Sequence, residues 1–555
     1  MSVLPINPIN SNDDNLAPEL PKQEPIKPEK KEKIVDEQEK REQQVFDEFS
    51  KKESTDENKS EIPQDMAQFQ DMANKVISEA IKQGGSVGTI NFQFGGVSAG
   101  NLYSSGHVVG GNQVNNQGVS SPSSANISSG IDYAAMPINS RIKQWFEDHQ
   151  AIHYRSLMIS MAFLNGSDLA SVNSLRDKLE SALRSKSKAD DKEIDKESDK
   201  FKNLEFGKRF KIILAHTEKR IENREFGGSQ FEVILFDTPD FQEALLKYIW
   251  EEQDYYWRIT LDCLMEVSTE HSSQTKVRLA AALSESCKYR FDLVRELVLL
   301  PLAKSDNPVQ RGITALCLGI TALGDGDFSP QQARNLLSHW STLKNSPNIR
   351  KTSTEAYSLY VGLKFLDEAF DRFLTIAKSN DVVFLLDILE GIVTLFERSE
   401  SIPENRLAIL KHLETWLNYS EKESPHKVAA HVTWGIMKMS NVSVQELNVK
   451  KLPTLFWLSK NDEKAEKTIS SLIRCSLNLK MTRSLVIQQL EIWFNLAEKE
   501  PELRQTLGKV ITRIIKYGNA REKERLQLYL NRWASQGKSY AFTLLTYLHQ
   551  KGLII

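Results

Sequence analysis

The chain has 555 residues, of which 40% are hydrophobic and 26% are charged; 71 basic and 74 acidic side chains leave a formal net charge of −3. This length exceeds what one hydrophobic core usually serves and predicts two to four structural units. The balanced charge excludes a global field that would attract nucleic acid or an anionic membrane, so any such binding must be local.

The cysteines and the start of the chain indicate a cellular compartment. Four cysteines, Cys263, Cys287, Cys317 and Cys475, lie far apart without a CxxC pair, which predicts buried free thiols in a reducing environment. The start, MSVLPINPINSNDD, lacks the basic and apolar regions of a secretory signal. The longest apolar run, Ile313 to Leu323, is too short to span a bilayer and predicts a core helix. We therefore expect a cytoplasmic protein without membrane association.

The N-terminal region is predicted to contain little structure. Residues 1–61 are rich in Pro, Glu, Lys, Asn and Ser, a composition that cannot bury enough apolar surface to offset chain entropy, so we expect a disordered arm. Residues 62–83 then predict a short amphipathic helix that ends at Gly84-Gly85. Its apolar residues are Met66, Phe69, Met72, Ala73, Val76, Ile77 and Ala80.

Residues 84–139 form a low-complexity segment rich in Gly, Ser and Asn. Within residues 84–118, short β-type pieces alternate with Gly-Gly and Gly-Asn turns. This segment has too few apolar residues to form a hydrophobic core of its own, but its uncharged strands suit β-arches stacked between identical chains. We predict that the segment mediates homotypic assembly through Ile90, Phe92, Phe94, Leu102, Tyr103, Val108, Val109, Gln113 and Val114.

Residues 140–237 have a helical pattern followed by strand-like pieces. Apolar periodicity predicts short helices up to residue 183, and a charged solvated loop over residues 184–202 follows. Two β-like pieces, Phe210 to Leu214 and Phe231 to Phe236, flank Gly227-Gly228. Helices followed by a strand pair are the pattern of a winged-helix unit.

Residues 238–555 carry a repeat signal. A large apolar residue closes a predicted helix about every 40 residues. After three of these ends a proline follows, Pro347, Pro425 or Pro501, at the first turn of the next helix, where its missing N–H costs nothing. Two-helix units of this length predict an α-solenoid; the alternative is an irregular helical domain without a true repeat. The closing residues are Leu302, Trp340, Phe373, Trp416, Trp457, Trp493 and Trp533. Both interpretations bury the tryptophans.

One stretch of the sequence indicates which type of repeat is present. The stretch Asp306 to Leu316, DNPVQRGITAL, resembles the opening of a HEAT-repeat inner helix, with its acid, proline, Val, Arg and small residues. The resemblance implies a HEAT-like array. We expect Val309, Ile313, Leu316 and Ile320 to form a buried stripe, and Gly312, Ala315 and Gly319 to allow close helix approach.

A wider resemblance concerns function. Trp145 to Leu183, with Phe231 to Asp237 and Ala244 to Trp250, is similar to the segment after the ATPase core of bacterial STAND-type signalling proteins, where a winged helix leads into helical repeats. Gly95 to Gln113 resembles bacterial amyloid-type signalling motifs and the RIP homotypic interaction motif. No nucleotide-binding core lies between the two regions. The resemblance implies a signalling adaptor.

Motifs for catalysis, cofactors or metals do not emerge from the sequence. There is no phosphate-binding GxxxxGK[ST] loop and no Gly-x-Ser-x-Gly elbow. His149 and His153 have the spacing of a zinc-protease pair, but Gln150 replaces the general base and no third ligand follows, which favours a packed or surface pair. We assign no catalytic, cofactor or metal residues, although an active site assembled from distant residues stays an alternative.

The predicted function is a non-enzymatic protein-interaction scaffold or signalling adaptor. The helical array would bind an unidentified partner protein, while residues 84–118 would assemble homotypically. The alternative is a nucleic-acid-associated regulator that uses the winged-helix-like unit. Acidic neighbours interrupt the basic residues Arg176, Lys178 and Arg184 there, so nucleic acid is the less favoured partner.

Overall fold

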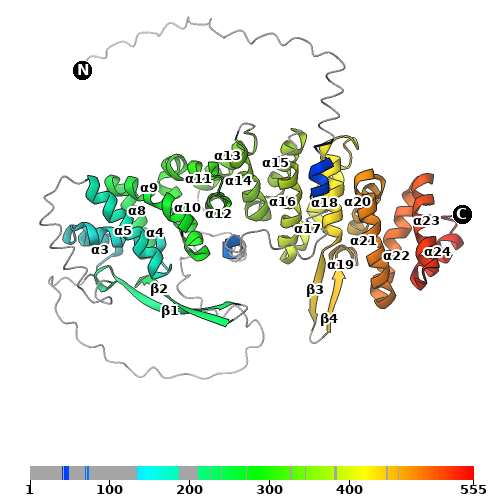
Figure 1. Cartoon of the computed structure of the whole chain (residues 1–555), viewed down its shortest axis with the longest axis horizontal. Helices are drawn as coiled ribbons and strands as arrows, with labels where there is room; N and C mark the ends of the chain where they lie inside the picture. Colours follow the sequence, from blue (N-terminus) through cyan, green and yellow to red (C-terminus); the bar gives the residue numbers. More distant parts are fainter. Residues whose placement is uncertain are drawn as a thin grey trace, which may run out of the picture.

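The structure is a computed structural model. It describes residues 40–41, 43–48, 69–70, 72–73, 133, 136–186, 210–224, 227–238, 240–270, 272–324, 328–343, 346–379, 384–445, 448–460 and 462–554. The described residues are mainly helical, with two antiparallel hairpins, which confirms the mainly α fold class. The helices form an elongated row from α3 at one end to α24 at the other (Figure 1).

The first unit of the row is built around α4. This helix is hydrophobic on all sides, and ten of its thirteen residues are buried, as expected for a helix surrounded by others. It contacts α5, α8 and α10, so the first unit continues into the array without a gap. The unit comprises α3 (Ile138–Asp148), α4 (Ile152–Leu164), α5 (Leu169–Lys186), β1 (Ala215–Arg224), β2 (Gly227–Phe236), α8 (Phe241–Glu252) and α9 (Asp254–Glu270).

The hairpin β1–β2 differs in position from the predicted strand pair. The predicted first strand, Phe210 to Leu214, is instead a helical turn in which Phe210 and Ile213 are buried. Short apolar runs fit a strand or a buried helical turn equally well, which explains the error. Leu214 has a φ of 57°, and the strand starts directly after it. Gly227 and Gly228 open β2 and pair with Arg224 and Asn223 rather than forming the turn.

A buried polar network joins the hairpin to the helices. Asn165, at the end of α4, donates to Oε1 of Gln242 over 3.0 Å and accepts from the N–H of Phe236 over 3.0 Å. Gln242 in turn donates to the carbonyl of Ala162 over 2.8 Å. Because each buried polar group has a partner, the network fixes the positions of α4, β2 and α8 relative to one another.

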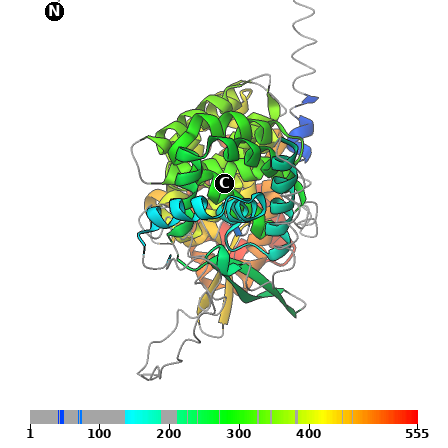
Figure 2. The ribbon, with the colours of Figure 1, turned by 90° about the vertical axis from the view of Figure 1, so that its left-hand side faces the viewer.

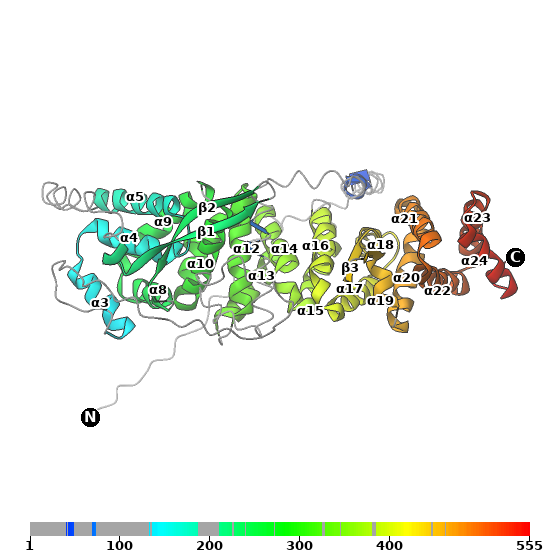
Figure 3. The same ribbon diagram turned by 90° about the horizontal axis from the view of Figure 1, so that it is seen from below.

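The remaining helices form a ladder, by which we mean the even-numbered helices from α10 to α22. Each ladder helix contacts the next ladder helix, although an odd-numbered helix separates the two in sequence (Figure 3). This next-but-one contact is typical of stacked helix pairs. The ladder helices are α10 (Ser273–Val294), α12 (Pro308–Leu323), α14 (Pro347–Leu359), α16 (Leu385–Arg398), α18 (Ser424–Met437), α20 (Glu463–Asn478) and α22 (Pro501–Tyr517).

In sequence, the odd-numbered helices α11 to α21 lie between successive ladder helices, and α23 and α24 follow α22. Short η4 (Arg295–Leu299), η5 (Val361–Leu363) and η7 (Ser399–Ser401) segments extend some of the links. The remaining helices are α11 (Leu300–Lys304), α13 (Ser329–Ser341), α15 (Leu366–Lys378), α17 (Pro403–Trp416), α19 (Thr454–Ser459), α21 (Lys480–Lys499), α23 (Ala520–Ser535) and α24 (Ser539–Gln550).

The seven residues predicted to close helices lie in seven successive odd-numbered helices, α11 to α23. Six of them are buried, but Trp457 is 45% exposed, so its predicted burial is wrong. The helix that carries it, α19, has only six residues and therefore presents little surface to cover an indole. The prolines predicted to open helices lie in the first turns of α14, α18 and α22.

Helix α12 shows how sequence sets the spacing of the ladder. The side chain of Asn307 caps it by accepting from the N–H of Val309 over 2.9 Å. The stripe Val309, Ile313, Leu316 and Ile320 is buried, as predicted. A Cβ on Gly319 would lie 2.7 Å from Cβ of Tyr360, at the end of α14, so the missing side chain lets the two segments approach.

A second hairpin was not predicted. Strands β3 (Ser440–Gln445) and β4 (Asn448–Pro453) pair antiparallel between α18 and α19. Both hairpins extend from the same side of the helical row (Figures 1 and 2).

Two pieces of the N-terminal region pack on the array. Residues 40–41 and 43–48, within the predicted arm, are helical, and Phe46 is fully buried. Residues 69–70 and 72–73, within the predicted amphipathic helix, are also helical, with Phe69 and Ala73 fully buried. Other parts of the arm, of that helix and of the 84–139 segment, and residues 187–202 of the predicted loop, lie outside the described residues. Arg184 to Lys186 continue α5.

The four cysteines are free thiols, which confirms the predicted absence of disulfides. Three are buried, whereas Cys475 is half-buried. Among the described residues, none of the helices combines the length and the apolar character that crossing a bilayer requires.

Candidate protein-interaction site

The histidine pair noted in the sequence is part of the packing of α3 and α4. The ring of His149 stacks on Trp145, with ring centroids 4.6 Å apart, and its Nδ1 lies 3.0 Å from the carbonyl oxygen of Trp145. Burial lowers the pKa of His149. His153 is buried beside Tyr154. Within the described ranges, no cluster of three or more His, Cys, Asp or Glu side chains could hold a metal ion.

A cleft lies near the C-terminal end of the described structure, where α20, α22 and α24 meet. We call it the C-terminal cleft; its volume is about 590 Å³, within the range of ligand and peptide sites. Its lining is rich in basic and aromatic side chains. It is lined by Glu463, Glu466, Arg504, Gln505, Gly508, Lys509, Thr512, Arg513, Lys516, Tyr517, Tyr540, Thr543, Leu544 and Tyr547.

The acidic groups of the cleft are already paired. Arg513 of α22 donates from Nε to Glu466 over 2.9 Å and from Nη2 to Glu463 over 3.3 Å. These contacts tie α20 to α22 and use both carboxylates. Lys509 and Lys516 are exposed, and neither forms an ion pair with any other residue that the structure describes. The cleft therefore presents net positive charge to an incoming group.

One wall of the cleft consists of tyrosine. The hydroxyl of Tyr540 donates to the carbonyl of Arg504, and a Cβ on Gly508 would lie only 2.7 Å from that hydroxyl oxygen. Gly508 therefore lets α24 approach α22. Tyr517 and Tyr547 are 59% and 44% exposed. Tyrosines of this kind supply apolar contact area and a hydrogen-bonding tip, which is why interfaces are enriched in them.

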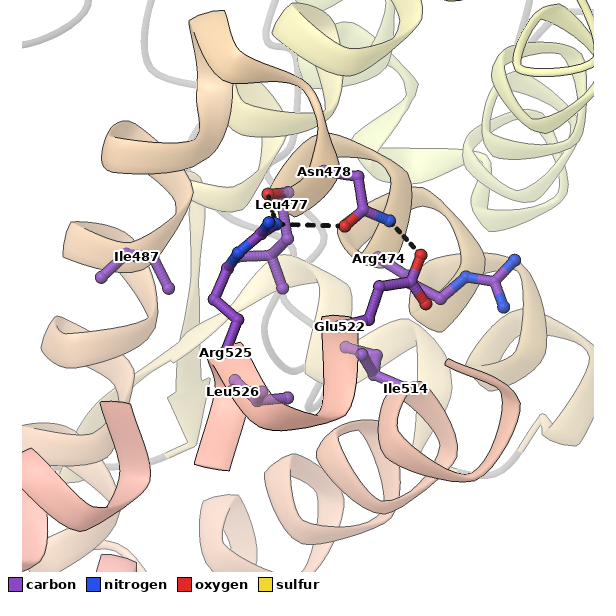
Figure 4. Close-up of a pocket in the computed structure, with 8 residues that line it drawn as sticks. All are labelled: Arg474, Leu477, Asn478, Ile487, Ile514, Glu522, Arg525 and Leu526. Atoms are coloured by element: carbon purple, nitrogen blue, oxygen red, sulfur yellow. Dashed lines mark hydrogen bonds between the residues drawn. The ribbon is translucent and has the colours of Figure 1, made fainter. Parts of the chain in front are cut away.

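A second, small hollow lies where α20, α21, α22 and α23 meet (Figure 4). Its volume is about 10 Å³, room for about one water. Asn478 donates to Glu522, while Arg525 donates to the carbonyl of Leu477 and to Oδ1 of Asn478 over 3.3 Å each. These bonds fasten α23 to the end of α20, so the hollow is a structural joint rather than a ligand site.

The basic residues noted in the sequence form ion pairs with neighbouring acidic side chains. On α5, Arg176 pairs with Asp177 and Arg184 with Glu180, and Lys178 pairs with Glu266 of α9. Near the C-terminus, Arg513 and Arg525 are held as described above. This arrangement leaves isolated cations rather than a continuous stripe that could follow a phosphate backbone.

The predicted assembly residues, Ile90 to Val114, all lie outside the described residues. Sequence reasoning did not identify the C-terminal cleft. The tyrosines of α24 meet the lysines of α22 only through the fold, because the whole of α23 separates Lys509 from Tyr547 in sequence. No local spacing rule could have connected them.

Comparisons with known proteins add little. Neither the known protein families nor the curated proteins include a match to this sequence. Among solved structures, one similar chain is an engineered protein from the Northeast Structural Genomics Consortium. It shares 13% identity, the match covers 56% of this chain and 85% of that one, and the TM-score is 0.21. A TM-score this low supports no conclusion.

Proposed function

We propose that this protein is a non-enzymatic interaction scaffold whose C-terminal cleft binds an acidic segment of a partner protein. The supporting observation is the combination of exposed Lys509 and Lys516 with the tyrosine wall. Carboxylates of a partner would supply the charge that the cleft lacks, since Glu463 and Glu466 are used by Arg513. The tyrosine rings would cover the apolar parts of the same segment.

The test is affinity capture from cells with two charge-matched variants of the full chain. Lys509→Glu with Lys516→Glu reverses charge inside the cleft, whereas Lys464→Glu with Lys467→Glu reverses the same charge on exposed positions of α20 outside its lining. We expect the first variant to lose partners that the second retains. Identical partner sets for both variants would reject the cleft as the binding site.

We infer that the ladder is HEAT-like. Support comes from the alternation of ladder and odd-numbered helices and from the prolines at the starts of α14, α18 and α22. Surfaces of such arrays bind extended partners because each repeat adds one helix pair to a continuous face. The resemblance to STAND-type signalling proteins makes a signalling adaptor the preferred biological role.

Homotypic assembly through residues 84–118 remains part of the proposal and rests on composition. Phe92 and Phe94 lie on the predicted β pieces, and carboxylates there would prevent stacking of identical strands. Full-length protein should form thioflavin-positive assemblies at high concentration, and Phe92→Asp with Phe94→Asp should prevent them. A wild-type chain that stays monomeric would remove this part of the proposal.

The nucleic-acid alternative rests on the order of helices α3 to α5 followed by the hairpin β1–β2. The paired cations of α5 argue against it. Duplex DNA or RNA binding that weakens steeply with salt, and that is lost on reversing the charge of Arg176 and Arg184, would favour this alternative over the scaffold.

A further inference from the structure

The N-terminal region contacts α18, which does not line the C-terminal cleft. The helical residues 40–41 and 43–48 lie beside α18 (Figure 1). The ring of Phe46 stacks on the ring of His431, with centroids 4.0 Å apart and an angle of 15° between the planes. Both side chains are buried.

The burial of α18 and the fixed orientation of its His431 ring favour this contact. All fourteen of its residues are buried, so it needs cover on every side. Its ladder neighbours α16 and α20, together with α15, α17 and α21, supply most of that cover. Phe46 covers His431. The Nδ1–H of His431 donates to the carbonyl of Lys427 over 2.7 Å, which fixes the ring for stacking.

The docked helix is attached through few side chains. Phe46 is buried and Val45 and Gln43 are half-buried, whereas Gln44, Asp47 and the other described positions are exposed. The sequence around it has the composition of a disordered chain, and the described contact buries only one aromatic side chain. Its helical form therefore depends on docking, and a contact with one aromatic anchor can be displaced.

We propose that the face of α18 around His431 is a reversible docking site for a short amphipathic helix, and that residues 40–48 occupy it in the same chain. A competing partner would present an aromatic anchor whose ring stacks on His431, as that of Phe46 does. Displacement would release the N-terminal region from the array. This proposal does not depend on the C-terminal cleft.

A labelled peptide of residues 38–50 tests the proposal on the full chain. In Phe46→Ala protein the site is vacated, so we expect the peptide to bind at least tenfold more tightly than to wild type. Gln44→Ala, an exposed position on the same helix, should behave as wild type. A peptide with Phe46 replaced by Ala should not bind, and adding His431→Ala to the Phe46→Ala protein should abolish binding.

Two results would overturn the proposal. One is equal binding of the peptide to wild type and to Phe46→Ala protein, which would show that residues 40–48 do not occupy the site. The other is a wild-type dimer that Phe46→Ala dissociates, seen by light scattering, which would assign the docked helix to a second copy. Far-UV circular dichroism and the melting temperature confirm that each variant is folded before binding is measured.

Discussion

Two tryptophans of the array occupy equivalent positions in sequence but different environments. Trp493 of α21 is fully buried and meets the ring of Phe456 edge-on, with centroids 4.4 Å apart. Trp457 of α19 is 45% exposed. The difference in burial, rather than the identity of the residue, should decide how much each contributes to the free energy of unfolding.

We predict that Trp493→Ala lowers the free energy of unfolding by about 3–5 kcal/mol, because it removes a large buried ring and leaves a cavity. Trp457→Ala serves as the matched control and should cost less than about 1 kcal/mol. Urea titration followed by circular dichroism measures both. Equal losses would mean that the exposed and buried environments assigned to the two indoles are incorrect.

At the scale of elements, the spacing of ladder helices depends on missing side chains. At Gly319 an added Cβ would overlap Tyr360 at 2.7 Å, whereas at Gly324 the nearest heavy atom would lie 3.4 Å away. Gly319→Ala should destabilise the protein by about 1–3 kcal/mol through overpacking. Gly324→Ala should change stability by less than about 1 kcal/mol. Thermal unfolding of the two variants checks the contrast, and a stabilising Gly319→Ala would contradict the close packing.

Docking of the 40–48 helix should also depend on pH. Burial is the main cause that lowers the pKa of His431, from 6.5 to about 4, outweighing the hydrogen bond to Lys427 and the charge of Asp47; the charge of Lys427 lowers it further. The docked state thus favours neutral His431. We therefore expect docking to weaken as the pH falls toward 4, because removing the cover that Phe46 supplies makes uptake of a proton by His431 easier.

This linkage predicts that the peptide of residues 38–50 binds Phe46→Ala protein more weakly at pH 5.5 than at pH 7.5. Fluorescence anisotropy at the two pH values measures the change. His431→Gln, which cannot take up the proton, should bind with an affinity that differs little between them. A pH effect of the same size in this variant would assign the titration to another group.

At the scale of the whole molecule, the sequence predicted the features that recur along the chain. It did not predict those that depend on contacts between residues far apart in sequence. The helix-closing residues of the odd-numbered helices, together with Pro347, Pro425 and Pro501, indicated where the helix pairs lie. They could do so because each marks a helix end or start within its own stretch of sequence. The C-terminal cleft could not be predicted, since Lys509 and Tyr547 meet only in the fold. Docking of Phe46 had a weak signal, an apolar Val-Phe pair within a charged run, but its partner His431 lies almost 400 residues away.

The same architecture predicts a gradient of local stability along the array. Ladder helices such as α14 contact a ladder helix on each side, whereas α23 and α24 contact the array on one side and expose Leu528 and Phe542, each by 65%. In repeat arrays, stability is approximately a sum of each repeat and its neighbour contacts, so the end with fewer contacts opens more often. Hydrogen exchange followed by mass spectrometry should find the slowest amides in α12 to α16 and faster exchange in α23 and α24. If α24 exchanges as slowly as α14, the array unfolds as one cooperative unit, and its stability is not a sum of neighbouring contacts.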